Sequence, residues 1–194
     1  MTTARVTVML AAAALVLAAC GNAGGEGTAN PAGDQAAAPP ATVTSTPAGS
    51  ADPAATAAAT PAELAFSATT LSGESFQGAS LAGKPVVFWF WAPWCPKCRA
   101  EAPAVKAAAA KFGDVAFVGV AGLDTEAAMK EFVQQTGTGD IVHLSDAKGA
   151  VWTKLGVSEQ STFVFMKPDG STEKASGPLS QDGLDGHVRQ LLGQ

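Results

Sequence analysis

The stretch PVVFWFWAPWCPKCRAEAP, at residues 85–103, constrains the fold more than any other part of the chain. Residues 85–91 form a continuous apolar run of β-branched and aromatic side chains, which is typical of a strand buried on both faces of a sheet. The Ala-rich segment at 95–112 has a helical pattern. Cys95 and Cys98 therefore lie where a buried strand ends and a helix begins. A Cys-x-x-Cys pair can hold a metal, close a structural disulfide or act as a redox couple.

Strand and helix patterns alternate on both sides of this segment. A strand that feeds a helix and then a second strand implies a parallel pair with a right-handed crossover. Two short strands at 64–84, with a turn at Ser72 and Gly73, come first, and a hairpin with the turn KPDG comes near the end. We predict an α/β fold in which a mixed central sheet carries helices on both faces, with an N-terminal β-hairpin extension. The other strands are expected at 115–122, 141–144, 162–166 and 171–176, and the other helices at 125–137, 147–157 and 180–193, with Thr125 and Ser180 as N-caps of the first and last.

The N-terminal third of the chain differs in composition. Residues 1–20 combine Arg5 with the apolar run VTVMLAAAALVLAA, which is too short to span a bilayer comfortably and is typical of a signal peptide. They end in LAAC, which resembles a bacterial lipobox. We expect lipidation of Cys20, as in palmitate-bearing lipoproteins, and anchoring to the outer face of the membrane; an ordinary signal peptide is the alternative. Residues 21–62 are mostly Ala, Gly, Pro, Thr and Ser, and we interpret them as a disordered linker before a domain at 63–194.

Charge and cysteine count exclude some classes of function. From residue 63 onward there are 11 Lys and Arg against 14 Asp and Glu, a net charge near -3, and no run of basic residues. This argues against nucleic acid as a partner. With a lipid on Cys20, only Cys95 and Cys98 remain, in an oxidising compartment. A four-cysteine zinc site within one chain is therefore excluded, and we expect neither a metal nor a cofactor.

The junction of strand and helix gives the two cysteines different environments. Unpaired backbone N–H groups and the helix dipole favour a thiolate at Cys95. Lys97 and Arg99 add positive charge, and Pro96 suits a first helical turn because its missing N–H would have no partner. We expect Cys98, one turn further, to be more buried. The spacing permits a disulfide that opens and closes with little backbone movement, with one cysteine attacking and the other resolving a mixed disulfide.

These residues resemble the active-site segment of the thioredoxin superfamily. Trp-Cys-Pro-x-Cys-Arg-x-Glu-x-Pro at 94–103 is similar to the extracytoplasmic DsbE/TlpA/ResA-type branch, and the lipobox and FVGVAGLD at 117–124 are similar to actinobacterial lipoproteins of the DsbF type. The resemblance covers about residues 63–194. It implies a thioredoxin fold, a redox-active Cys95–Cys98 disulfide, exchange with exported cysteine-containing proteins, and reoxidation by a VKOR-like membrane partner. We also expect a monomer.

The resemblance also implies roles for neighbouring side chains. Glu101 matches an acidic residue one helical turn after the resolving cysteine, where it can exchange protons with the pair as a general acid/base; a solvated helix glutamate is the alternative. Trp94 is expected to shield the disulfide and, with Pro96 and Lys97, to contact substrates. Trp89 stands where cytoplasmic thioredoxins carry a buried aspartate, which leaves Glu101 as the only carboxylate near the pair in sequence.

The segment EQSTFVF, at 159–165, departs from the family pattern. Thioredoxin-fold proteins usually carry a cis-proline just before this strand, opposite the cysteines, where it handles substrate and keeps metal ions off the thiols. Ser161 stands there in this chain, followed by Thr162, and both are candidate substrate-binding residues. Because a cis bond before a non-proline residue costs about 3 kcal/mol, we expect the bond between Gln160 and Ser161 to be trans. We expect Ser161→Pro to speed exchange with unfolded substrates and to reduce any metal affinity.

These features favour a thiol–disulfide oxidoreductase that oxidises exported proteins. The alternatives are a reductase for cytochrome c maturation, a metal-binding module, for copper for instance, with Cys95 and Cys98 as soft ligands, and an inactive lipoprotein that only binds partners. The only histidines are His143 and His187. We expect His143 to be a half-buried strand residue and His187 to be a surface residue of the last helix, and neither to be a metal ligand.

Overall fold

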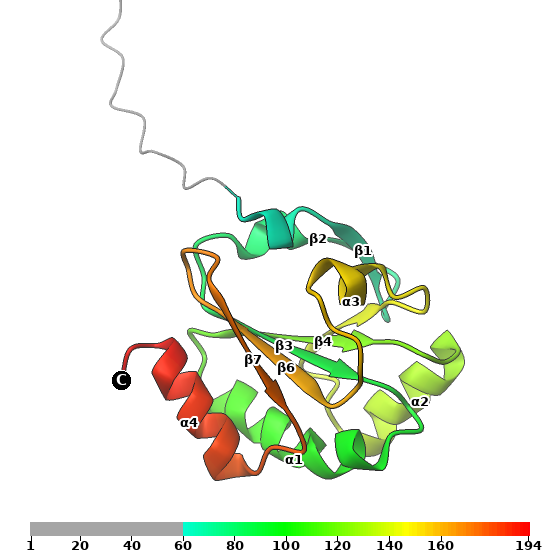
Figure 1. Cartoon of the computed structure of the whole chain (residues 1–194). Helices are drawn as coiled ribbons and strands as arrows, with labels where there is room; N and C mark the ends of the chain where they lie inside the picture. The colour runs from blue at the N-terminus through cyan, green and yellow to red at the C-terminus, as the bar shows by residue number, and fades with distance from the viewer. Residues whose placement is uncertain (1–59) are drawn as a thin grey trace, which may run out of the picture. The chain divides into compact units, whose positions relative to one another are not determined.

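The computed structural model describes residues 60–194, which form a seven-stranded sheet with helices on both faces (Figure 1). The order across the sheet is β2-β1-β5-β4-β3-β6-β7. The strands are β1 (Ser67–Thr70), β2 (Ser75–Gln77), β3 (Val86–Trp91), β4 (Ala116–Ala121), β5 (Val142–Ser145), β6 (Thr162–Met166) and β7 (Thr172–Ser176). The helices are α1 (Pro96–Lys111), α2 (Glu126–Thr136), α3 (Ala150–Lys154) and α4 (Gln181–Leu191), with two 3-10 turns, η1 (Ala62–Leu64) and η2 (Gly78–Leu81).

The sheet is mixed, as the sequence predicts. β3, β4 and β5 run parallel to one another. β6 pairs antiparallel with β3, and β7 pairs antiparallel with β6. β1 and β2 form the expected N-terminal hairpin, and β1 joins the sheet antiparallel to β5. The α/β class and the hairpin extension are therefore confirmed.

β3 runs between β4 and β6, and all six of its residues are buried. Successive side chains of a strand point to opposite faces of the sheet. Val87, Trp89 and Trp91 therefore pack into the core formed with α1, α2 and α4. The other three residues pack into the second core, which α3 covers. This alternation points Trp89 toward the helix that begins beside the cysteines.

Helices α1, α2 and α4 lie on one face of the sheet and α3 lies on the other (Figure 1). Both expected N-caps are confirmed. Thr125 Oγ1 accepts the N–H of Ala128 at 3.3 Å, and Ser180 Oγ accepts the N–H of Gly183 at 3.2 Å. Gly137 ends α2 with a φ of 63°, a left-handed conformation that costs glycine little.

Helix α3 is shorter than the sequence predicts. The sequence predicts a helix at 147–157, whereas the helix spans only Ala150–Lys154. The Asp146 carboxylate lies before it and accepts the N–H groups of Ala150, Val151 and Trp152 at 2.8, 2.8 and 2.9 Å. Residues 147–149 are therefore a turn that carries the chain from Asp146 to the helix.

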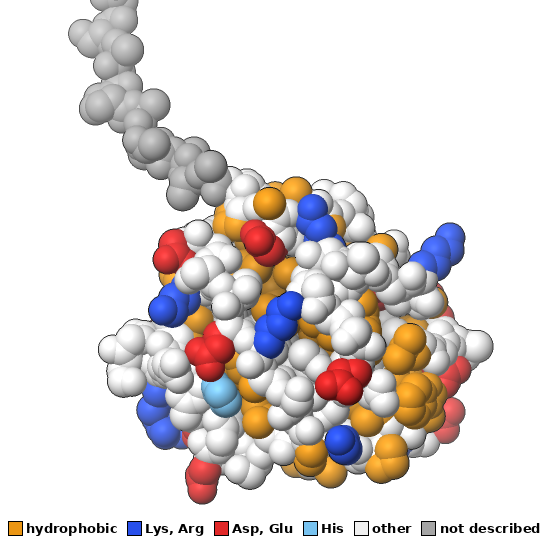
Figure 2. Space-filling view, in the orientation of Figure 1, with side chains coloured by type: hydrophobic (Ala, Val, Ile, Leu, Met, Phe, Trp, Pro, Cys, Tyr) orange, Lys and Arg blue, Asp and Glu red, His pale blue; other side chains and the backbone are white. Residues whose placement is uncertain are grey.

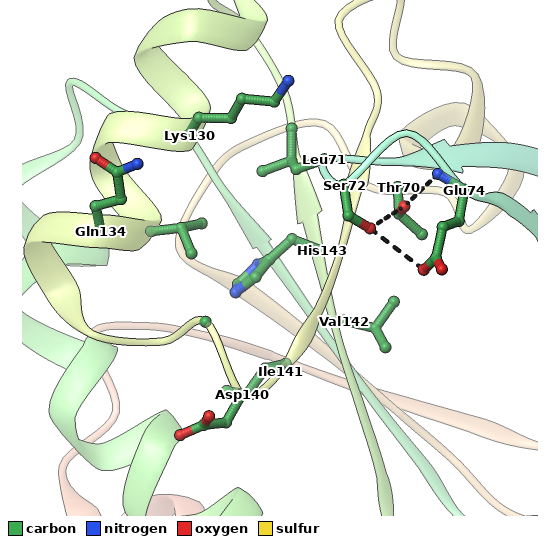
Figure 3. A pocket seen from close by; sticks show the side chains of 12 residues that line it. Thr70, Leu71, Ser72, Glu74, Lys130, Gln134, Asp140, Ile141, Val142 and His143 are labelled. Atoms are coloured by element: carbon green, nitrogen blue, oxygen red, sulfur yellow. Dashed lines mark hydrogen bonds between the residues drawn. The ribbon is translucent and has the colours of Figure 1, made fainter.

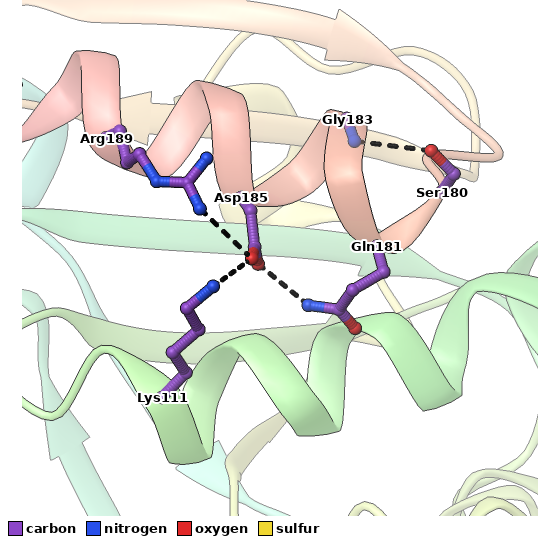
Figure 4. Close-up of polar contacts among 6 residues, drawn as sticks. All are labelled: Lys111, Ser180, Gln181, Gly183, Asp185 and Arg189. Carbon is purple, nitrogen blue, oxygen red and sulfur yellow. Dashed lines mark hydrogen bonds and ion pairs between the residues drawn. The ribbon is translucent and has the colours of Figure 1, made fainter.

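Helix α4 is attached to α1 by a polar cluster around Asp185 (Figure 4). The Asp185 carboxylate is buried and accepts from Lys111 of α1 at 2.5 Å and from Gln181 at 2.7 Å. Arg189 lies 3.7 Å from the same carboxylate. The C-terminal helix is thus fixed against the helix that carries the cysteine motif.

The surface of residues 60–194 carries both signs of charge. Figure 2 shows Lys and Arg side chains interspersed with Asp and Glu on one face, without a large patch of one sign. No helix in the described part of the chain is long and apolar enough to span a bilayer. The expected signal peptide (1–20), Cys20 and nearly all of the expected linker (21–62) lie outside the described residues.

Candidate functional site

Cys95 and Cys98 lie at the junction of β3 and α1. Cys95 is the N-cap of α1, and its Sγ accepts the N–H of Cys98 at 3.2 Å. Both residues are buried, Cys98 completely and Cys95 with 3% of its surface exposed, and both are free thiols. Pro96 occupies the first turn of the helix, as expected. A thiolate at Cys95 therefore receives a backbone N–H and faces the positive end of the helix dipole.

The surroundings of Cys98 oppose its ionisation. Burial raises the pKa of the Cys98 thiol far above its ordinary value, and the hydrogen bond with Cys95 raises this pKa further. Since thiolates rather than thiols attack disulfides, the arrangement favours Cys95 as the nucleophile and keeps Cys98 protonated.

The residues expected to contact substrates at α1 are exposed beside Cys95. Trp94 has 54% of its surface exposed, and its Nε1 donates to the carbonyl oxygen of Leu123 at 3.1 Å. Pro96 and Lys97 are also exposed. A partner chain can therefore approach the cysteine pair over these three side chains.

Glu101 is buried, so the alternative of a solvated helix glutamate is wrong. Only 1% of its surface is exposed. Its Oε1 accepts from Trp89 Nε1 at 2.6 Å, and its Oε2 accepts from Ser161 Oγ at 2.9 Å. Burial raises the pKa of the Glu101 carboxyl; these two hydrogen bonds and the positive charge of Lys97 lower it less than burial raises it. The carboxyl is thus held near Cys98, whose pKa its charge also raises.

Ser161 is held inside the protein. The only cis peptide bond among residues 60–194 is the one before Pro178, so the expected trans bond between Gln160 and Ser161 is confirmed. Ser161 has a left-handed φ of 60° and 2% exposure. Its N–H donates to Phe90 at 2.9 Å, its carbonyl oxygen accepts from Gly177 at 2.5 Å, and its hydroxyl donates to Glu101. All three polar groups of Ser161 are therefore engaged within the chain. The neighbouring Thr162 begins β6 and is buried.

The sequence did not identify two residues that shape this site. The sequence marks Trp89 only as the residue in place of the usual aspartate, although the alternation of β3 points its ring toward α1. No local pattern in the sequence marks Gly177 as part of the site. A Cβ at Gly177 would overlap Glu101 Oε2 and Ser161 Oγ, so only glycine leaves room for that hydrogen bond.

The two histidines lie elsewhere. His143 is buried rather than half-buried: its Nδ1 accepts from Trp91 Nε1 at 3.2 Å, and burial lowers its pKa to about 4. His187 packs on the ring of Phe165 and lies 3.5 Å from Glu173. Within the described part of the chain, no three His, Cys, Asp or Glu residues are grouped to hold a metal ion.

A surface hollow lies away from the cysteines, between the β1–β2 turn, α2 and the start of β5 (Figure 3). On its rim the hydroxyls of Thr70 and Ser72 are 2.8 Å apart, and Ser72 donates to Glu74 at 3.3 Å. Neither cysteine nor Glu101 lines it. It does not belong to the site.

Comparison with known proteins identifies relatives of similar sequence. Residues 59–174 match the AhpC/TSA family. The soluble secreted antigen MPT53 of Mycobacterium tuberculosis is 46% identical over 131 residues, which cover 66% of this chain and 75% of that protein. The thiol-disulfide oxidoreductase ResA of Oceanobacillus iheyensis is 31% identical over 122 residues, 61% of this chain and 62% of that protein.

Solved structures show the same fold. The structure of MTB dsbF in its mixed oxidised and reduced forms is 49% identical, covers 68% of this chain and 98% of that one, and gives a TM-score of 0.66. A secreted Mycobacterium tuberculosis disulfide oxidoreductase homologous to E. coli DsbE is 45% identical. The match covers 66% of this chain and 97% of that one and gives a TM-score of 0.63. The expected thioredoxin fold is therefore confirmed.

Proposed function

The chain belongs to the AhpC/TSA family and is a thioredoxin-like thiol–disulfide oxidoreductase, and we propose that it oxidises cysteine pairs of exported proteins with a Cys95–Cys98 disulfide. The observation that carries this proposal is the position of Cys95 as the N-cap of α1, where its Sγ accepts the N–H of Cys98. This contact and the helix dipole stabilise the thiolate of the reduced state. A couple whose reduced form is stabilised is a strong oxidant.

The reaction proceeds by two thiol–disulfide exchanges. A substrate thiolate attacks Cys95 Sγ, the Cys95–Cys98 bond breaks, and a mixed disulfide with Cys95 forms. Cys98 leaves as a thiolate and takes up a proton. The second substrate thiolate then attacks the substrate sulfur of the mixed disulfide, and Cys95 leaves as a thiolate. Two electrons pass from the substrate dithiol to the cysteine pair.

Glu101 is the proton donor and acceptor for Cys98 in this scheme. Its carboxyl is buried and has a raised pKa, so it carries a proton at a higher pH than an exposed glutamate does. Cys98 has a raised pKa and takes up a proton when it leaves the disulfide. In the reverse direction the carboxylate removes that proton as a general base.

The substrate contacts the exposed side chains around Cys95. Trp94, Pro96 and Lys97 form this surface, whereas Thr162, at the start of β6, is buried. The protein works as a monomer on the outer face of the cell membrane, attached by a lipid on Cys20, and a VKOR-like membrane protein reoxidises it. The description of two relatives as secreted supports a position outside the cytoplasm, and the lipid anchor rests on the lipobox-like LAAC alone.

The reduction potential of the Cys95–Cys98 couple tests the direction of electron flow. We expect equilibration with glutathione buffers at pH 7 to give a value well above the about −270 mV of thioredoxin. Oxidation of a reduced, unfolded protein should then proceed to completion. A potential at or below the thioredoxin value would contradict the oxidase and favour a reductase.

Mixed disulfides test the roles of the two cysteines. Cys98→Ser should accumulate them through Cys95, because no resolving thiol remains, whereas Cys95→Ser should form none. Non-reducing gels of the two matched variants give the readout. Accumulation with Cys95→Ser alone would reverse the assignment.

A further inference from the structure

The Glu101 carboxyl is surrounded by partners of two kinds. Trp89 Nε1 donates to Oε1 at 2.6 Å, and the backbone N–H of Leu179 also hydrogen bonds to the carboxyl. Indole and backbone N–H groups only donate. Ser161 Oγ lies 2.9 Å from Oε2, and a hydroxyl either donates or accepts. Ser161 is therefore the only one of the three partners that can accept a hydrogen bond from a protonated Glu101.

This difference matters because a proton on a buried carboxyl needs an acceptor. An ionised Glu101 accepts from all three partners. Once protonated, its O–H has to donate, and leaving a buried donor without an acceptor is unfavourable. Rotation of the Ser161 hydroxyl removes this cost, since the same pair of oxygen atoms stays bonded with the direction reversed.

The backbone around Ser161 is built to keep that hydroxyl in place. A left-handed φ is unfavourable for a residue with a side chain and persists only where the surroundings fix it. Here φ is 60°, and hydrogen bonds from the Ser161 N–H to Phe90 and from the Gly177 N–H to the Ser161 carbonyl hold the residue on both sides. Gly177 also leaves the space in which Ser161 and Glu101 meet.

We propose that Ser161 is a positioning residue whose hydroxyl reverses its hydrogen bond as Glu101 gains or loses the proton that it exchanges with Cys98. The proposal rests on the acid/base role of Glu101 proposed above, but not on the direction of electron flow. Ser161 thus acts on the cysteines through Glu101 and not by contact with the substrate.

Few other titratable groups face this carboxyl. Lys97 and Cys98, both on α1, are the ones whose charges act on or respond to Glu101. β3 and the segments before β6 and α4 contribute Trp89, Ser161 and the Leu179 backbone, none of which titrates near neutral pH. On β5, the ring of His143 packs 6.3 Å from that of Trp89.

The test compares three full-length variants. Ser161→Gly removes the hydroxyl and tolerates the left-handed backbone. Trp89→Phe removes a donor to the other carboxyl oxygen and keeps a ring in the core. Leu123→Gly is the control for relief of backbone strain, because Leu123 also has a left-handed φ, of 62°, but makes none of the hydrogen bonds to Glu101. The three readouts are the ¹³C shift of the Glu101 carboxyl against pH, the infrared bands of the protonated carboxyl and the pH dependence of exchange with dithiothreitol.

Ser161→Gly removes the hydrogen bond between the Ser161 hydroxyl and Glu101. This bond is stronger when Glu101 is ionised than when it is protonated, so the variant destabilises the ionised form more. We therefore expect Ser161→Gly to raise the titration midpoint of Glu101 by about one pH unit, Trp89→Phe to raise it as well, and Leu123→Gly to leave it unchanged. Only Ser161→Gly should shift the infrared O–H band of protonated Glu101, whose O–H has then lost its acceptor. The C=O band should shift in Ser161→Gly and also in Trp89→Phe, because Trp89 donates to Oε1, the carbonyl oxygen of the protonated form. In Ser161→Gly, exchange with dithiothreitol should slow by about tenfold. This is a part of the roughly 10²–10⁴-fold rate increase that a positioned acid/base group contributes.

Two results would overturn the proposal. The first is an unchanged Glu101 midpoint and O–H band in Ser161→Gly. The second is slower exchange with no displacement of the pH profile, which would indicate that Ser161 acts on the substrate. Dithiothreitol exchange can be followed in both directions, so these readouts remain valid even if the protein proves to be a reductase.

Discussion

Two residues other than glycine adopt a left-handed backbone among residues 60–194, and both lie close to the cysteine pair in the fold. Leu123 accepts the indole N–H of Trp94, and Ser161 donates to Glu101. Strained residues of this kind cluster at functional sites, where the surrounding structure fixes them. At Ser161 the strain reverses an expectation drawn from the sequence. Proline requires a φ near −65° and has no N–H, whereas Ser161 has a φ of 60° and donates its N–H to Phe90.

Ser161→Pro should therefore destabilise the protein rather than speed exchange. Proline cannot adopt the φ of 60° that this position has and cannot donate the backbone hydrogen bond to Phe90, so we expect a loss of about 3 kcal/mol or more in the free energy of unfolding. Urea unfolding measures this loss. Ser161→Gly is the matched control and should cost clearly less, because glycine accepts the same φ. A Ser161→Pro variant as stable as the parent, with faster exchange, would restore the original expectation.

At the scale of single elements, local capping explains both the successes and the failure of the sequence patterns. α2 and α4 begin beside Thr125 and Ser180, whose side chains accept N–H groups three residues on, as their positions predict. α3 begins later than predicted because Asp146 accepts from the first turn across the bend at Gly149, which has a φ of 71°. A cap that reaches over four to six residues leaves no standard signature in the sequence.

Asp146→Ala should unravel the start of α3. It leaves three buried or half-buried N–H groups without their acceptor, and we expect a loss of roughly 2–3 kcal/mol in the free energy of unfolding. Amide hydrogen exchange should accelerate first at residues 150–152. The control is Asp169→Ala, which removes an exposed carboxylate that accepts from Ser171 in the β6–β7 turn, and it should cost less than about 1 kcal/mol. Equal losses for the two variants would contradict the special role of Asp146.

At the scale of the whole molecule, the residues of the site come together at one end of the sheet. β3 ends there, and β6 begins there because it runs antiparallel to β3, with Phe90 opposite Thr162. β7 ends there for the same reason, with Ser176 opposite Thr162, which brings the Gly177 backbone to Ser161. The polar cluster of Asp185 and Lys111 fixes α4 against α1 (Figure 4).

The proposed lipid anchor makes a prediction at this scale. The full chain should fractionate with membranes in a bacterial host that processes lipoproteins, and Cys20→Ser should move it to the aqueous fraction, because a lipid chain contributes about 0.8 kcal/mol per buried CH₂. The reduction potential of the Cys95–Cys98 pair should stay the same in both forms. Cys95→Ser is the control and should remain with the membranes. Recovery of the parent chain in the aqueous fraction would point to an ordinary signal peptide.

Local patterns in the sequence determined the secondary structure apart from the bounds of α3, the mixed sheet and the place of the cysteines. A buried strand, a Cys-x-x-Cys and an Ala-rich helix occupy consecutive residues, so their geometry follows from strand and helix periods and from the helix N-terminus. The surroundings of Glu101 could not be predicted in this way. Its acceptor and donor Ser161 lies 60 residues further along the chain, and the contact exists only because β6 pairs with β3 in one register. Pairing between distant strands, rather than any local propensity, therefore decided that Glu101 is buried and what it bonds to.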